Sequence, residues 1–216
     1  MKNLIIQHWN GPLPLWAQKC KQSVADYAEQ IGAEYQLLSG YPFITPPDKF
    51  EVKPWTVIQK IYMIDSVYDK YENVLMLDMD MMAITRFPVD NIFNYKGIGR
   101  LHLKSMSGLN NSRSRLWPKL YKEGEPSFFG NCVKLTKEER VTLRSVCDKE
   151  EIINASNDGL PPNDESIMHY LMHRSNVLKN KKVLELPHSK FCDLVEEAHP
   201  EATLIHFCGP RKNSIK

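Results

Sequence analysis

Two aspartates separated by one residue, Asp78 and Asp80, directly follow the apolar run 74–77. Side chains alternate along an extended strand, so both carboxylates leave on the same side of the chain and can approach one ion. Two carboxylates this close repel each other beside apolar residues, and a bound divalent cation is the simplest compensation. Ordinary strand-end carboxylates that cap a helix match the same spacing. The apolar run in front of the pair favours the metal site.

The chemistry that such a pair supports is the stabilisation of a leaving phosphate group. Mg²⁺ and Mn²⁺ take oxygen ligands and share them with substrate phosphates, and a histidine ligand would favour Mn²⁺. When a sugar leaves a nucleoside diphosphate, negative charge grows on the diphosphate, and a bridging dication stabilises that charge. In open α/β sheets ligands bind beyond the carboxyl ends of strands, which is where this pair lies.

The elements that would position this pair are read from the spacing of apolar residues. A short apolar run at 4–6 predicts a strand, and apolar positions recurring every three or four residues over 16–31 predict a helix. A second strand is expected at 34–38 and a second helix at 57–67. The run 74–77 is apolar on both faces, as in a central parallel strand covered by helices. The alternation predicts an α/β fold with a doubly wound, Rossmann-like, mostly parallel sheet.

The second half of the sequence is less regular. Thr136 followed by Glu139 has the pattern of a capping box at the start of a helix, and another helix is expected from 163 through 170. Strands are expected at 99–103, 131–135, 182–186 and 203–207. The length favours one domain over 1–216, with 1–80 as a nucleotide-binding half and 81–216 as an acceptor-side half, and the chain could be part of a longer protein.

The composition is that of an ordinary globular protein. A net charge of +2 gives no field that would attract nucleic acid or a membrane. The first apolar run is too short for a signal peptide or a membrane span. The five cysteines include no C-x-x-C pair, so we expect reduced core residues and a cytoplasmic protein, which in a viral context means the host cytoplasm. They are Cys20, Cys132, Cys147, Cys192 and Cys208.

Several motifs together resemble one known group. An apolar strand ending in D-x-D and a late H-x-x-G-x-x-K, here running from His206 through Gly209 to Lys212, are similar to the hallmarks of GT-A-fold glycosyltransferases, especially glycosyltransferase family eight. The stretches 128–133 and 163–165 also resemble family segments. The compact length is similar to that of a virus-encoded glycosyltransferase domain that decorates a capsid protein. The chain departs from the family after Lys212, where relatives carry Pro-Trp, and at Glu165, where relatives carry an amide.

The resemblance implies roles for the late motif. His206 would be the third metal ligand beside Asp78 and Asp80. Gly209 would let the backbone approach the diphosphate, and Lys212 would supply a cation to its oxygens. A histidine satisfied by one hydrogen bond and a lysine in a basic tail are the alternatives.

Donor binding would also involve the start of the chain. The first strand of such folds usually holds the uridine, so Gln7 and Asn10 are the candidates, while Trp9 offers an apolar surface or a core residue. Lys60 would contact the donor phosphate or sugar, unless it is an exposed helical lysine. Asp78 is expected to contact the donor through the metal.

For catalysis the resemblance implies transfer from a UDP-sugar to a glycan with retention of the anomeric configuration. Asp164 is the preferred carboxylate and Glu165 the second, although Asp164 is also a plausible helix N-cap. A haloacid-dehalogenase-like Mg²⁺-dependent phosphatase also places D-x-D after an apolar strand, but usually on the first strand. A non-catalytic nucleotide-sugar-binding module is the third alternative.

Overall fold

The computed structural model describes residues 2–47, 52–84, 88–101, 128–155, 163–180, 185–187, 189–191, 193–194 and 199–215. Its main sheet has five strands in the order β2-β1-β3-β6-β5. The strands are β1 (Asn3–His8), β2 (Glu34–Leu38), β3 (Asn73–Leu77), β5 (Gly99–Leu101) and β6 (Phe128–Thr136). β1 pairs in parallel with β2 and β3, whereas β6 runs antiparallel to β3 and β5. The prediction of a mostly parallel sheet is confirmed.

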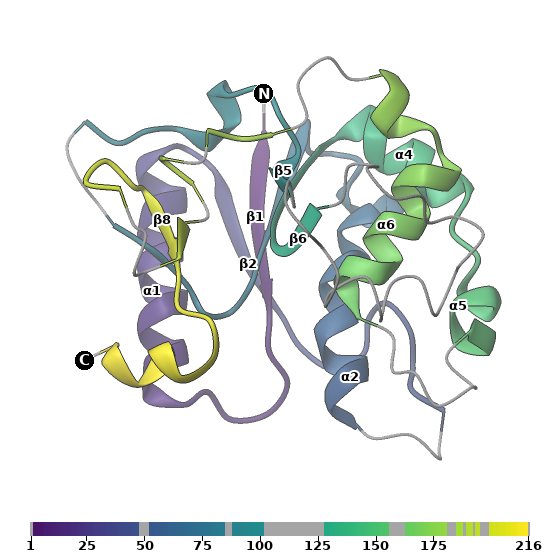
Figure 1. Cartoon of the computed structure of the whole chain (residues 1–216), viewed down its shortest axis with the longest axis horizontal. Helices are drawn as coiled ribbons and strands as arrows, with labels where there is room; N and C mark the ends of the chain where they lie inside the picture. Colours follow the sequence, from purple (N-terminus) through teal and green to yellow (C-terminus); the bar gives the residue numbers. More distant parts are fainter. Residues whose placement is uncertain are drawn as a thin grey trace.

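Helices cover both faces of this sheet (Figure 1). α1 (Leu15–Gln30) lies on one face, and its buried residues include Val24 and Tyr27 at the predicted helical spacing. On the other face lie α2 (Val52–Val57), α4 (Lys137–Ser145) and α6 (Asp164–Arg174). β3 serves both layers, since Val74 packs in the core under α6 and Leu75 in the core under α1. The apolar run before the aspartates is therefore a fully buried strand, as predicted.

The second predicted helix is only partly α-helical. α2 continues as a 3₁₀ helix, η1 (Ile58–Ile64), which is followed by the short η2 (Ser66–Tyr68). The Gln59 side-chain amide donates to the Trp55 carbonyl at 2.7 Å, the acceptor that its own backbone N–H would use in an α-helix. This local competition was not visible in the apolar spacing, which Ile58 and Ile61 satisfy in either helix type.

A second, three-stranded sheet returns the chain to the end of β3. It contains β4 (Met81–Ala83), β7 (Asp193–Leu194) and β8 (Leu204–His206) in the order β4-β8-β7. β4 and β8 are antiparallel with Met81 opposite His206, so the predicted late strand lies beside the aspartates. The C-terminal η5 (Gly209–Ser214) follows next to α1 (Figure 1). The predicted strand at 182–186 lies mostly outside the described residues, although Glu185 bridges to Gly99.

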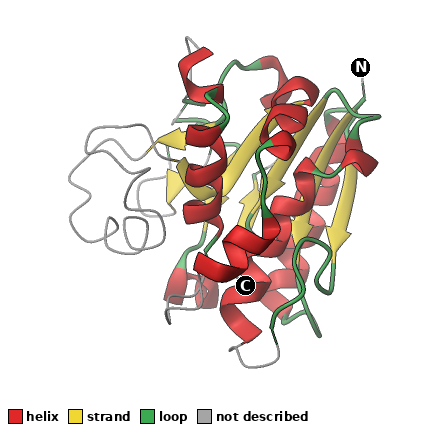
Figure 2. Ribbon diagram, turned by 90° about the vertical axis from the view of Figure 1, so that its right-hand side faces the viewer, coloured by secondary structure: helices red, strands yellow, loops and turns green. Residues whose placement is uncertain are grey.

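Figure 2 shows the helices packed against the strands, and the helices and helical turns not yet described are short. α4 begins with the predicted capping box, in which the Thr136 side chain accepts from the Glu139 N–H and the Glu139 side chain accepts from the Thr136 N–H. The other elements are η3 (Ile92–Asn94), α5 (Lys149–Ala155) and η4 (Val177–Asn180). Across the described ranges, none of the helices has both the length and the apolar character that crossing a membrane requires.

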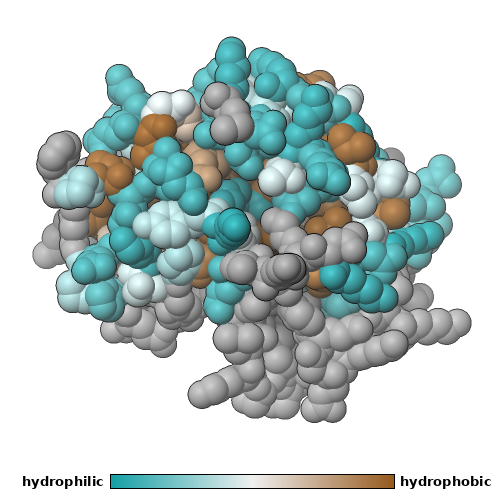
Figure 3. All heavy atoms as spheres, turned by 90° about the horizontal axis from the view of Figure 1, so that it is seen from above, coloured by the Kyte–Doolittle hydropathy of each residue, from teal (hydrophilic) through white to brown (hydrophobic). Residues whose placement is uncertain are grey.

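The surface is mixed in character. Figure 3 shows a face on which hydrophilic side chains surround scattered apolar ones. Within the described ranges, the large apolar side chains that are exposed lie on four different elements, namely Leu15, Val57, Val67 and Val141. Single exposed apolar residues are ordinary on soluble domains and indicate no docking surface.

Candidate metal and donor site

The backbone at the end of β3 is held from three sides. The Asp78 N–H donates to the Asn131 carbonyl on β6 at 2.8 Å, and the Gln7 side-chain amide donates to the Asp78 carbonyl at 2.9 Å. The Phe207 N–H donates to the Asp80 carbonyl at 2.9 Å, which ties the segment to the end of β8. The two aspartates therefore sit on a fixed frame.

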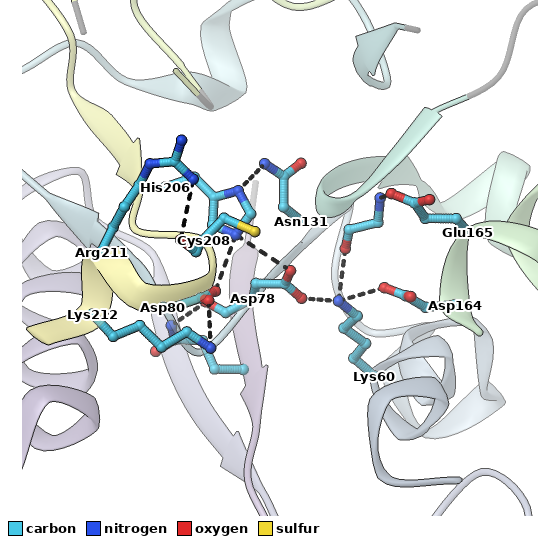
Figure 4. A network of polar contacts seen from close by, with 12 residues as sticks. Lys60, Asp78, Asp80, Asn131, Asp164, Glu165, His206, Cys208, Arg211 and Lys212 are labelled. Carbon is cyan, nitrogen blue, oxygen red and sulfur yellow. Dashed lines mark hydrogen bonds and ion pairs between the residues drawn. The ribbon is translucent and has the colours of Figure 1, made fainter. Parts of the chain in front are cut away.

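Three candidate metal ligands meet at this point (Figure 4). Asp78, Asp80 and His206 each offer one ligand atom, and these atoms lie within 4.8 Å of one another. His206 Nε2 is 3.1 Å from Asp80 Oδ1 and 3.8 Å from Asp78 Oδ2. Two carboxylates and one imidazole form a suitable donor set for Mn²⁺ or Mg²⁺. The Asn131 side-chain amide lies 3.0 Å from the other nitrogen of His206 and holds the ring in place.

Asp80 is kept ionised by its neighbours. Burial alone raises its pKa, but the hydrogen bonds and charges of His206 and Lys212 outweigh burial and hold the pKa at about 2. Lys212 Nζ lies 2.8 Å from Asp80 Oδ2 and also sits over the Trp16 ring, 4.9 Å from its centroid. At neutral pH Asp80 is a carboxylate, which is the form that a divalent cation requires.

Lys60 links the metal-site aspartates to the predicted catalytic carboxylates. It is only 5% exposed, so the alternative of an exposed helical lysine is wrong. Its Nζ pairs with Asp78, lies 2.6 Å from Asp164 Oδ2 and donates to the Gly130 carbonyl at 2.7 Å. Glu165 accepts from the Gly130 N–H at 3.2 Å. The buried ammonium of Lys60 thus pairs with one carboxylate of the metal site, Asp78, and with one predicted catalytic carboxylate, Asp164.

The start of α6 places Asp164 against β6. The helix N-cap is Asn163, whose side chain accepts from the Ser166 N–H at 2.6 Å, so the alternative of Asp164 as N-cap is wrong. Gly130 makes this approach possible, since a Cβ there would lie 2.1 Å from Asp164 Oδ2. Asp164 is left to face Lys60.

A pocket opens beside these charges. Asn10, Lys60, Asp78, Asp80 and Lys212 are the predicted site residues in its wall, together with aromatic and apolar neighbours. The full lining is His8, Trp9, Asn10, Trp16, Thr56, Val57, Lys60, Leu77, Asp78, Met79, Asp80 and Lys212. Trp9 stacks edge-on against Trp16, with ring centroids 5.4 Å apart. The combination of a flat apolar wall and a charged floor suits a nucleoside diphosphate.

Two predicted donor residues lie outside this wall. Gln7 is fully buried and bonded to Asp78 and Tyr35, so its predicted contact with the nucleotide is not supported, and it acts instead on the position of Asp78. Gly209 is exposed, has a φ of +64° and begins η5.

His8, in the wall of the pocket, is buried, and burial lowers its pKa, with the nearby Lys60 charge adding to the effect, so its imidazole is neutral.

The sequence reasoning missed Asn131 and Trp16 as site residues. Asn131 stood within a predicted strand, and its polar side chain in a buried strand was the available signal. Trp16 stood at a core-like position of the first helical pattern. Only the return of η5 toward α1 places Trp16 beside Lys212.

Comparisons with known proteins identify the fold. No protein-family model and no curated protein matches the sequence. Among solved structures, a glycosyltransferase involved in the glycosylation of the major capsid of PBCV-1 is similar over 99% of this chain and 98% of its own, with a TM-score of 0.60 and 14% identity. The galactosyltransferase LgtC, solved with donor and acceptor sugar analogs, is similar over 96% of this chain and 87% of its own, with a TM-score of 0.55 and 12% identity. The chain therefore has the GT-A fold of these glycosyltransferases, as predicted.

Proposed function

We propose that this protein is a metal-dependent glycosyltransferase that uses a UDP-sugar donor. The observation that carries the proposal is the convergence of Asp78, Asp80 and His206 at the carboxyl end of a buried strand, in the wall of an aromatic pocket. A site of this kind lies where open α/β sheets bind nucleotides. The fold shared with two glycosyltransferases supports the same function.

The residues of the site have separate tasks in this proposal. Asp78, Asp80 and His206 would hold Mn²⁺ or Mg²⁺, which when bound offsets the charge that grows on the departing diphosphate. Lys212, already close to Asp80 and Trp16, would turn its ammonium to the diphosphate oxygens. Gly209, at the start of η5, would let the backbone approach the same group.

The nucleotide and the sugar would lie on opposite sides of the metal. Asn10 and Trp9, in the 1–80 half, would border the uracil, since an aromatic ring and an amide suit its face and its edge. Asp164 and Glu165, in the 81–216 half, would border the transferred sugar. Lys60 contacts Asp78 on the metal side and Asp164 on the sugar side. In this proposal its ammonium would move from these carboxylates to the phosphate or sugar of the bound donor.

The finer features of the reaction rest on the resemblance to family eight. Transfer would retain the anomeric configuration, with Asp164 as the carboxylate nearest the sugar carbon. The sugar would be a hexose or a deoxyhexose such as rhamnose, and the acceptor a glycan. A viral capsid glycoprotein is the proposed carrier of that glycan, because one of the similar structures is a glycosyltransferase involved in the glycosylation of a major capsid. This chain would then act in the host cytoplasm.

The phosphatase alternative is less well supported by the geometry. Haloacid-dehalogenase-like enzymes usually carry this pair on the first strand, whereas the pair here follows β3. A non-catalytic nucleotide-sugar-binding module would use the same pocket and differ only in turnover.

One assay separates these functions. The protein is incubated with a panel of UDP-sugars and GDP-sugars, with Mn²⁺ or with a chelator, and release of nucleoside diphosphate is followed. Metal-dependent release from one UDP-sugar supports the transferase. Phosphate release from simple phosphomonoesters without that activity supports the phosphatase, and binding without turnover in the presence of glycan acceptors supports the module. The Asp80→Asn variant, which removes one metal-ligand charge, is the matched control.

A further inference from the structure

A lysine of the late motif lies over an aromatic ring in the wall of the pocket. Lys212 Nζ is 4.9 Å from the centroid of the Trp16 ring and 2.8 Å from Asp80 Oδ2. Figure 4 shows the Lys212 side chain reaching from η5 to Asp80. An ammonium over an indole ring is attracted by the negative potential of the ring face. Lys212 thus has one partner that is a candidate metal ligand, Asp80, and one that is not, Trp16.

The Trp16 ring is itself held in place. Trp16 is the second residue of α1 and packs against an apolar cluster that joins α1 to β8 and to the segment after η5. The ring also meets Trp9 edge-on, at an interplanar angle of 85°. Both tryptophans line the pocket. The ring that carries the ammonium is therefore fixed by packing. The members of the cluster are Cys20, Ala202, Ile205, Phe207 and Ile215.

The two partners of Lys212 differ in their response to a cation at the candidate metal site. Such a cation would compete with the ammonium for the Asp80 carboxylate. An indole ring is not a ligand of Mg²⁺ or Mn²⁺, which take oxygen ligands and imidazole, so the contact with Trp16 can persist. Lysine has a flexible four-carbon stem, and holding its ammonium in one place costs conformational entropy. Trp16 can therefore keep the ammonium beside the pocket when Asp80 is occupied.

We propose that Trp16 is a positioning residue that holds Lys212 beside the diphosphate throughout donor binding. Trp16 then acts on the affinity for the donor through the Lys212 ammonium and not by touching the nucleotide. Two other roles would also place this ring in the wall of the pocket, namely packing alone and direct stacking on the uracil. The inference rests on the UDP-sugar donor of the proposed function.

A double-mutant cycle separates these roles. Trp16→Leu removes the ring and keeps an apolar side chain, and Lys212→Met removes the ammonium and keeps the stem. At saturating Mn²⁺, Trp16→Leu should weaken the binding of UDP, measured by isothermal titration calorimetry, by roughly 3-fold to 30-fold. In the Lys212→Met background the same substitution should weaken it by less than about twofold. Losses that multiply would overturn the inference, because packing and uracil stacking do not depend on the ammonium.

Two further variants control for the shape of the pocket and for folding. Trp16→Phe keeps an aromatic face and should lose less UDP affinity than Trp16→Leu, whereas equal losses in two folded variants would contradict the cation contact. Trp9→Leu removes the neighbouring tryptophan of the wall, and its loss should multiply with that of Lys212→Met. The same coupling of Trp9 to Lys212 would indicate general disruption of the pocket and would overturn the inference.

The position of the ammonium can also be read without any turnover. Protons over the face of an indole ring resonate upfield, so the ε-methylene of Lys212 should be shifted upfield in protein labelled with ¹³C-lysine, with Lys212→Met providing the assignment. The shift should persist with saturating Mg²⁺ and UDP and should be lost in Trp16→Leu. A shift that disappears when Mg²⁺ alone is added would overturn the inference. If the wild type binds no UDP in the presence of Mn²⁺, the proposed function and this inference fail together, whereas normal binding with losses that multiply overturns the role of Trp16 alone.

Discussion

Replacing Lys60 with methionine tests the charge balance of the site. The substitution keeps a long apolar stem and removes the ammonium that joins Asp78, Asp164 and the Gly130 carbonyl. Loss of one partner of a buried ion pair typically costs about 3–5 kcal/mol. We expect the free energy of unfolding to fall by about 3–4 kcal/mol in metal-free buffer.

The measurement is urea unfolding followed by circular dichroism. The control is a lysine that also pairs with an aspartate but is more exposed to solvent. Lys190 lies 2.7 Å from Asp90, with 27% of its side chain exposed, so Lys190→Met should lower the free energy of unfolding much less than Lys60→Met does. Adding Asp164→Asn to Lys60→Met should recover part of the loss, because one unpaired charge is removed. Lys60→Met should also bind Mn²⁺ more tightly, since a competing cation has left Asp78. Equal losses for Lys60→Met and Lys190→Met would refute this account of Lys60.

Three further changes have defined outcomes. Gly130→Ala places a Cβ against Asp164 and so displaces this carboxylate from Lys60, so nucleotide release from the active donor should fall at least about tenfold and the temperature of unfolding should also fall, and unchanged release would contradict the close approach. Thr136→Ala removes the α4 N-cap and should cost about 1 kcal/mol in urea unfolding, which a value near zero would refute. The hydrogen bond from Arg144 lowers the pKa of Asp69, so this pair stabilises the fold above the unfolded pKa and the contribution is lost as pH falls through the lower folded pKa. Asp69→Asn should therefore flatten the acid limb of the stability curve, and an unaltered limb would contradict it.

The parts of the fold that the sequence predicted are those with local causes. The helical spacing of α1, the apolar run of β3 and the capping box at Thr136 each depend on neighbours within a few residues. The two motifs that flank the metal centre were also readable, because each follows an apolar strand. The two motifs lie side by side because β8 pairs with β4. The sequence indicated this proximity only through the resemblance to family eight.

The parts that the sequence did not predict depend on contacts between distant segments. The helical pattern alone left Lys60 open as an exposed lysine. It is buried because it contacts Gly130 on β6 and Asp164 on α6, both of which are distant in sequence. Asn131 contacts His206 across 75 residues of sequence, and no periodicity encodes such a pair. The displacement of the N-cap from Asp164 to Asn163 is a shift of one residue, within the usual uncertainty of helix boundaries.

The most direct test of the central claim is Mn²⁺-dependent binding of UDP to the wild type and to Asp80→Ala, measured by isothermal titration calorimetry. Asp90→Ala, which removes a carboxylate paired with Lys190 away from the site, is the control. We predict that the wild type and Asp90→Ala bind Mn²⁺ and then UDP, while Asp80→Ala remains folded and loses both. Unaltered Mn²⁺ affinity in Asp80→Ala would contradict the proposed metal centre.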